Sequence, residues 1–224
     1  PGGFPLLGYG LTETNAIGCG NFNENYLAKP SSTGKASRPL VDLAILDEAG
    51  KPLPVGEVGE IGIRTVANVL GYWGDKEATS AAFTDDMYFR TGDLGRLDED
   101  GYLFIVDRKK DIIIRGGENI ACLEVEGALH RHPDVAEAGV FPIPDERLGE
   151  IVGAGVQLKP GARVDEAGLQ AFLADHLAAF KIPDRLWLRS DPLPRGGTDK
   201  TDRRALRAQC LAADTEAGAP INEE

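Results

Sequence analysis

The chain has 224 residues, 42% of them hydrophobic and 27% charged, which is enough apolar sequence for one large or two smaller soluble domains. Its net charge of −12 argues against an extended surface for nucleic acid or anionic membranes. No apolar run reaches the ~20 residues of a membrane span. The three cysteines are far apart, without zinc-ligand spacing, and indicate free thiols in a reducing cytoplasm.

The first half of the chain, up to residue 110, is rich in predicted strands. Two apolar runs, Val41–Leu46 and Val58–Arg64, are separated by glycine and proline turn residues. Two further runs flank Asp100-Gly101, a dipeptide that strongly favours a hairpin. The chain starts with PGGFPLLGYG and no methionine, so we expect a portion of a longer protein.

From Asp111 onward, strands alternate with helices, which predicts a second, α+β domain of about 100 residues. The expected strands are DIIIRGG, EAGVFPI, IVGAGVQLK and DRLWLRSD, and the expected helices are CLEVEGALHRH, EAGLQAFLADHLAAF and DRRALRAQCLA. The middle helix would place one apolar face on the core: Leu169, Phe172, Leu173, Leu177 and Phe180. Residues 212–224 are small and acidic, which predicts a disordered tail.

Three motifs suit a nucleotide but are ambiguous individually. GYGLTET, from Gly8 to Thr14, offers an aromatic face, hydroxyls and a carboxylate, although a glycine-rich turn would look the same. Asp93 in TGD could accept ribose hydroxyls or could simply belong to a turn. GGTDKT resembles a phosphate loop, but Asp199 stands where a Walker motif needs glycine.

Taken together and in order, the motifs are more specific. The full series of motifs is GYGLTET, GYW, YFRTGD, GYLFIVDRKKD, RGGENI with EVE, FKIP, and LP followed by K and RRAL. Through these motifs, the sequence resembles the acyl-CoA synthetase branch of the adenylate-forming enzymes. The resemblance covers nearly all of residues 1–210. It implies an α+β fold in which residues 1–109 end a large N-terminal domain and residues 110–211 form a small mobile C-terminal domain.

The resemblance implies roles for residues of the first half. Tyr9 would stack on adenine, Thr12 would bond the α-phosphate, and Glu13 would coordinate Mg²⁺. Asp93 would accept the ribose hydroxyls and Arg108 would donate to the ribose. The remaining residues implied in the ATP or AMP site are Gly8 and Ile105.

In the second half, the resemblance implies that Lys200 stabilises charge developing between the α-phosphate and the carboxylate during adenylation. Lys110 occupies the hinge position of the family. Rotation there would exchange Lys200 for the loop of Gly116, Gly117 and Glu118, which would line the tunnel for CoA. Asp199 departs from the family, which usually has glycine before this lysine, and its carboxylate could hold Lys200 away from phosphate.

The predicted activity is that of an AMP-forming acyl-CoA synthetase, which uses ATP, Mg²⁺ and CoA on a small carboxylic acid. Gly10 stands where acetate-activating relatives have tryptophan, so a medium- or long-chain fatty acid or an aryl acid is expected; the alternative is that the turn needs this glycine. The Gly/Ser/Thr-rich loop for the β- and γ-phosphates is not in the sequence, so we expect the 224 residues alone to be inactive. A fatty acyl-AMP ligase, a peptide-synthetase adenylation domain and a non-enzymatic binding fragment stay open, as does an oligomer.

Overall fold

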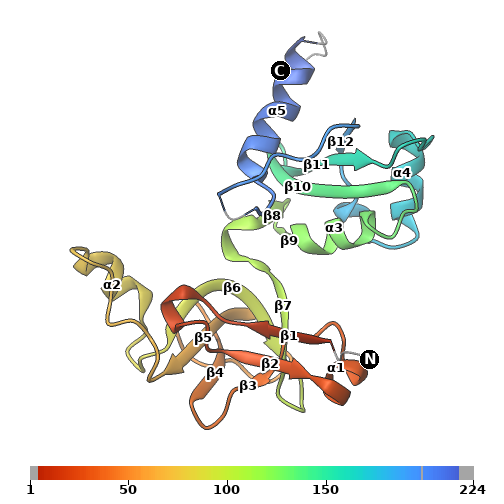
Figure 1. Ribbon diagram of the computed structural model, residues 1–224. Coiled ribbons are helices and arrows are strands. Elements are labelled where there is room, and N and C mark those ends of the chain that lie inside the picture. Colours follow the sequence, from red (N-terminus) through yellow and green to blue (C-terminus); the bar gives the residue numbers. More distant parts are fainter. Residues whose placement is uncertain (1–4, 198, 217–224) are drawn as a thin grey trace. The chain divides into compact units, whose positions relative to one another are not determined.

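The computed structural model describes residues 5–197 and 199–216 (Figure 1). The chain divides into two compact units with the boundary between Lys110 and Asp111, and each unit is described by itself. Sheets dominate both units and helices are few, so the predicted α+β class is confirmed. Within the described part of the chain, no helix is both long and apolar enough to cross a membrane.

The first unit is built on a seven-stranded antiparallel sheet with the order β1-β2-β3-β7-β6-β5-β4. The strands are β1 (Leu6–Tyr9), β2 (Cys19–Phe22), β3 (Gly34–Ala36), β4 (Val41–Leu46), β5 (Gly59–Thr65), β6 (Phe89–Leu97) and β7 (Tyr102–Arg108). Its helices are α1 (Asn23–Ala28) and α2 (Lys76–Ala82), and two 3₁₀ turns are η1 (Thr12–Thr14) and η2 (Lys109–Asp111), the latter crossing the boundary.

The strand predictions for this unit are confirmed where the sequence alternates. β4 has the expected bounds, β5 lies one residue beyond its expected bounds, and β6 and β7 form the predicted hairpin around Asp100-Gly101. Residues from both edge strands, among them Tyr9 in β1 and Val41 in β4, pack on the same apolar cluster. The sheet therefore curls around this core, which brings strands that are distant in the sheet order close together.

The second unit has a five-stranded sheet in which β8 (Ile112–Arg115) and β9 (Glu118–Ala121) form a hairpin beside β10 (Val135–Asp145) and β11 (Gly149–Leu158). β12 (Arg185–Arg189) pairs in parallel with β11. The helices are α3 (Cys122–Leu129), α4 (Glu166–Ala174) and α5 (Arg203–Glu216), with a 3₁₀ turn, η3, at Ala179–Lys181.

Helices cover both faces of this second sheet. Val140 of β10 packs with α3 and α4, whereas its neighbour Phe141 packs with Leu206 and Cys210 of α5. Since successive strand residues point to opposite faces, α3 and α4 share one face and α5 covers the other. The unit thus has three layers, with α5 opposite the other two helices (Figure 1).

The expected ends of two elements in this unit are wrong. The helix expected over EAGLQAFLADHLAAF ends at Ala174, and Leu177 and Phe180 reach the same core from the separate turn that includes η3. Apolar spacing could not distinguish these arrangements, because both bury the same side chains. Residues 212–216, which were expected in a disordered tail, belong to α5, and the rest of the expected tail, residues 217–224, lies outside the described residues.

Candidate functional site

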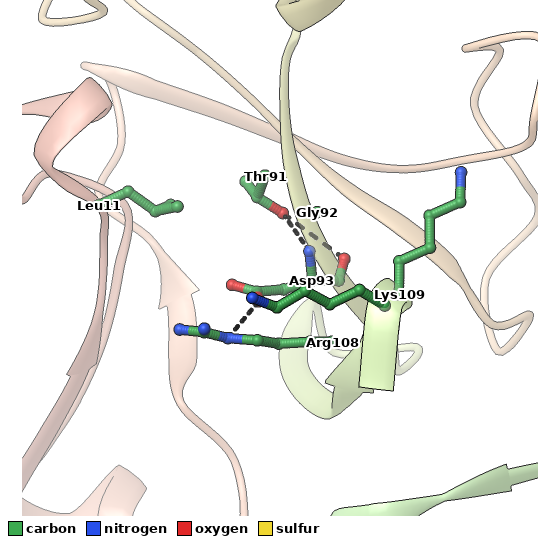
Figure 2. Close-up of a pocket in the computed structure, with 7 residues that line it drawn as sticks. Leu11, Thr91, Gly92, Asp93, Arg108 and Lys109 are labelled. Carbon is green, nitrogen blue, oxygen red and sulfur yellow. Dashed lines mark hydrogen bonds and ion pairs between the residues drawn. The ribbon is translucent and has the colours of Figure 1, made fainter. Parts of the chain in front are cut away.

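The centre of the candidate site is the β6–β7 hairpin, which places Asp93 directly opposite Arg108. The Nε atom of Arg108 lies 3.6 Å from Oδ1 of Asp93 (Figure 2). The Asp93 side chain is 16% exposed and that of Arg108 is 50% exposed, so a shielded acceptor lies beside a reachable cation. The two residues are adjacent because antiparallel pairing brings the middle of β6 to the end of β7.

Tyr9 at the end of β1 also binds Asp93. Its hydroxyl donates a hydrogen bond of 2.6 Å to Oδ2 of Asp93. Burial, together with this bond, raises the pKa of Tyr9 well above its ordinary value, so the phenol remains a donor at neutral pH. Sequence reasoning had assigned Tyr9 only a ring that stacks on adenine and did not foresee this bond.

The turn before Asp93 is held by side chains and by a buried carboxylate. The Thr91 hydroxyl donates to the carbonyl of Ile61 (2.8 Å) and accepts from the Asp93 amide (3.2 Å; Figure 2). Gly92 has a φ of +72°, and its amide donates to Oε1 of Glu60 (3.1 Å). The position of Asp93 is therefore determined by its neighbours.

Glu60 was not foreseen from the sequence. Its side chain is 8% exposed and accepts from Arg90 (2.8 Å) and, at 3.5 Å, from Lys109. A buried carboxylate needs cations or donors around it, and here they come from Arg90, from the Gly92 amide and from Lys109 beside the unit boundary. The signal that could have found it is a lone acidic residue within the apolar strand GEIGIRT.

A cavity of about 500 Å³ lies beside Asp93 and Arg108 within the first unit (Figure 2). Its lining consists of Leu11, Thr91, Gly92, Asp93, Arg108, Lys109 and Lys110. One carboxylate and three cations around an open cavity can bind a sugar hydroxyl and an anion at the same time. This combination suits a nucleotide.

Thr12 and Glu13 lie in the turn η1, next to Leu11 of the cavity lining. Oε1 of Glu13 accepts from the hydroxyl of Tyr72 at 3.2 Å, and its second oxygen has no bond within the described residues. Mg²⁺ is commonly held by one or two carboxylates together with substrate phosphates, so Glu13 fits as a ligand. In the part of the chain that the structure describes, no group of three or more His, Cys, Asp or Glu could hold a metal by itself.

Gly8, Gly10 and Ile105 have structural settings of their own. Gly8 pairs with Gly20, and Ile105 packs on the core of the first unit beside Tyr9. A side chain at Gly10 would place its Cβ 2.6 Å from the backbone of Ala16. The close approach to Ala16 therefore requires glycine at position 10 whatever the substrate, which removes the sequence argument for a large acid.

The predicted residues of the second unit lie in two exposed turns. Gly116 and Gly117 form a two-residue turn with φ of +59° and +91°, and Arg115 pairs with Glu118 across it. Such turns require positive φ, so the turn alone explains both glycines. Their assignment to a CoA tunnel stays a prediction.

Lys200 lies in the loop before α5. Its carbonyl accepts from the Gly196 amide (2.8 Å), while its side chain is exposed and has no bond within the described residues. Asp199 before it has a φ of +59°, the left-handed region that favours glycine. Arg195 and Thr201, at either end of this turn, both bind Glu137 (2.9 and 3.0 Å), which holds the base of the loop.

Comparison with known proteins accounts for this arrangement. Residues 3–73 match the family model of the AMP-binding enzyme, and residues 124–200 match that of the AMP-binding enzyme C-terminal domain. A 2-succinylbenzoate–CoA ligase of Geobacillus kaustophilus is 44% identical over 89% of this chain and 40% of its own length. A fatty acid–[acyl-carrier-protein] ligase, ScoC, of Streptomyces coeruleorubidus is 41% identical over 89% of this chain and 38% of its own length.

A solved structure is also similar. ATP-bound MatB from Rhodopseudomonas palustris has a TM-score of 0.83 and 37% identity, over 91% of this chain and 40% of that protein. The two family models together cover well over half of the sequence, and the chain belongs to the AMP-binding, adenylate-forming enzymes, as the motifs predicted. It spans about 40% of the length of the relatives that it matches.

Removing the Tyr9 hydroxyl tests whether it positions Asp93. We expect Tyr9→Phe to weaken AMP binding about fivefold and to lower stability by about 1–2 kcal/mol, since a hydrogen bond to a charged group is lost. Tyr9→Leu should weaken binding further if the ring stacks on adenine, because stacking contributes roughly 1–3 kcal/mol per base. Calorimetric titration of the chain with AMP measures the affinities, and urea unfolding measures the change in stability.

The matched control is Tyr26→Phe, because the Tyr26 hydroxyl has no bond within the described residues and Tyr26 is outside the cavity. Equal AMP affinity in Tyr9→Phe and in the unaltered chain would show that the hydroxyl does not position Asp93.

Proposed function

We propose that the enzyme carrying this chain activates a carboxylic acid with ATP and then transfers the acyl group to CoA. In the first step a carboxylate oxygen attacks the α-phosphorus and pyrophosphate leaves; in the second the CoA sulfur attacks the acyl carbon and AMP leaves. The observation that carries the proposal is the pair of Asp93 and Arg108 in one cavity, with Asp93 held from behind by the Tyr9 hydroxyl, in a chain similar to a CoA ligase.

The first unit would bind the nucleotide. Asp93 would accept the ribose hydroxyls and Arg108 would donate to the ribose, with the Tyr9 ring against adenine. The Tyr9 hydroxyl and the Thr91 turn keep the carboxylate in place before the nucleotide arrives. Such preorganisation lowers the ordering cost of binding.

The phosphate end would lie at η1. Thr12 would donate to the α-phosphate, Gly8 would line the site with its backbone, and Glu13 would hold Mg²⁺ through the oxygen that Tyr72 does not contact. When bound, Mg²⁺ would neutralise charge on the phosphates.

Lys200 would stabilise the charge that develops during adenylation, with Lys110 as the hinge that brings it to the nucleotide. The exposed side chain and the anchored base of its loop support this role, because such a lysine can be presented to a separate site. In the other orientation, the turn of Gly116, Gly117 and Glu118 would border the path of CoA.

An acyl carrier protein is the alternative to CoA as the acceptor of the acyl group. ScoC, which is similar to 89% of this chain, is named as a ligase for an acyl carrier protein. An acyl carrier protein presents the same pantetheine thiol as CoA on a protein surface. CoA is the first proposal because the relative at 44% identity is a CoA ligase.

The acid would be a medium- or long-chain fatty acid or an aryl acid. The names of the two relatives support this class, since one acts on 2-succinylbenzoate and the other on a fatty acid. An oxalate–CoA ligase at 38% identity points to smaller acids, so substrate size needs a direct test.

Lys200→Ala should lower the adenylation rate by about 10²–10³, because a cation acting on developing charge is removed. Thioester formation from supplied acyl-adenylate should stay within about threefold of the unaltered enzyme. Pyrophosphate exchange and acyl-CoA formation measure the two steps. Lys76→Ala, at another exposed lysine, is the control, and equal loss in both steps would contradict the assignment.

Asp199 offers a separate test of charge and backbone conformation. Asp199→Asn removes the charge and still tolerates positive φ, whereas Asp199→Gly also removes the backbone cost. If the carboxylate weakens the field of Lys200, both variants should adenylate about threefold faster, the effect of an exposed charge of roughly 0.6 kcal/mol. Pyrophosphate exchange decides, and slower exchange in both variants would show that the carboxylate assists Lys200.

A series of acids tests the substrate class. We expect kcat/KM to rise from acetate to octanoate, because each buried methylene contributes about 0.8 kcal/mol, or roughly fourfold. Benzoate and oxalate extend the series to an aryl acid and to a small diacid. Acetate or oxalate as the best substrate would contradict the proposed class while leaving adenylation itself intact.

A further inference from the structure

Arg203, the first residue of α5, joins three separate segments of the second unit. Its Nε and one terminal nitrogen donate to the two carboxylate oxygens of Glu126 in α3, at 3.0 and 2.9 Å. Its other terminal nitrogen donates to Oδ2 of Asp111 at 2.8 Å. Asp111 is the first residue beyond the unit boundary, so one guanidinium connects the boundary, a core helix and the segment that follows Lys200.

The connection is shielded and strongly charged. The side chains of Arg203, Asp111 and Glu126 are 24%, 19% and 13% exposed. Burial alone would lower the pKa of Arg203, but the two carboxylates outweigh burial and raise it. Only arginine offers donors in a planar fork that can bind both partners at once, so lysine is not an equivalent substitute.

The segment from Arg203 back to Lys200 is held at several points. The Asp202 amide donates to the carbonyl of Pro194 (2.8 Å), and the Asp202 side chain caps α5 by accepting from the Ala205 amide (3.0 Å). The Thr201 hydroxyl donates to Glu137 of β10. A change in the position of Asp111 relative to the first unit would therefore be transmitted to Lys200.

The residues before the boundary are tied to the first unit. Lys109 lies 3.5 Å from the buried carboxylate of Glu60, and Arg108 pairs with Asp93. Lys110 is exposed, and its side chain has no hydrogen bond or ion pair within the described residues. Ion pairs therefore hold the residues on each side of Lys110 to their own units.

We propose that Arg203 is a positioning residue for Lys200: by binding Asp111, it makes the first residue beyond the boundary and the Lys200 loop one rigid body, with Lys110 as the pivot. The inference rests on the proposed function. It adds the contact that would set the position of Lys200 when the second unit rotates.

The Arg203–Glu126 contact stabilises the fold of the second unit, because Glu126 also accepts a hydrogen bond from the Val140 amide of β10 (2.9 Å). The Arg203–Asp111 contact instead holds the residue next to the unit boundary. Substituting Asp111 therefore removes the proposed coupling and leaves the Arg203–Glu126 pair in place. Stability alone cannot explain an effect that is confined to this contact.

The kinetic test compares Asp111→Ala, Arg203→Lys and the double variant in the complete enzyme. We expect each to lower kcat of pyrophosphate exchange about tenfold and to leave KM for ATP within about twofold, because the nucleotide-binding groups belong to the first unit. The double variant should lose no more than either single variant, as residues that act through one contact are not additive. The control is Arg204→Gln, next in sequence, exposed and without a side-chain bond in the described residues.

Backbone motion provides a readout that does not depend on activity. In the 224-residue chain, the amide order parameter of Asp111 from NMR relaxation should be near the value of about 0.85 that is typical of rigid backbone. Arg203→Gln should lower it, whereas Arg204→Gln should not. An unchanged Asp111 order parameter in Arg203→Gln would overturn the inference.

The outcomes separate this inference from the proposed function. An unaltered enzyme that shows no pyrophosphate exchange with any acid overturns the proposed function and this inference with it. An active enzyme in which Asp111→Ala exchanges at the unaltered rate overturns only the role of Arg203. A loss in kcat that is additive in the double variant also overturns it.

Discussion

The carboxylate of Asp93 is the group around which the first unit is organised. It faces Arg108 because β6 and β7 pair in antiparallel register, and it binds Tyr9 because the sheet curls until β1 approaches β6. Each contact constrains a different oxygen of the same side chain. The cavity beside it therefore has an acceptor of defined direction, which a nucleotide site needs to recognise a sugar.

Two other carboxylates, Glu60 (buried) and Glu126 (13% exposed), hold charged residues near the unit boundary. The Glu60 carboxylate accepts hydrogen bonds from the Gly92 amide, Arg90 and Lys109. The Glu126 carboxylate accepts them from the Val140 amide and from Arg203. A buried charge that loses its partner costs several kcal/mol, so these contacts have few alternatives. On each side of Lys110, charged contacts therefore hold neighbouring residues to their own unit.

The loop that carries Lys200 combines a fixed base with an exposed tip. Glu137 holds Arg195 and Thr201 at the base, and Asp199 adopts the left-handed backbone at the tip. A tip of this kind can act on a ligand bound elsewhere, whereas a buried lysine could not. Asp199 places a carboxylate and a backbone preference for glycine at the same position, and substitution by asparagine or by glycine separates these two features.

Sequence alone was enough to predict the α+β class, the strands with clear alternation and the family, because local periodicity and ordered motifs depend on neighbouring residues. It also named Tyr9, Asp93 and Arg108 as candidates, but not the hydrogen bond from Tyr9, which joins residues 84 positions apart in the chain. Glu60 and Arg203 were not singled out, because the local sequence does not name the distant partners that a charged side chain will bind. These contacts became visible only in the three-dimensional structure, because they depend on which distant segments pack together. The structure also showed a local constraint, the close approach of the Ala16 backbone that requires glycine at position 10.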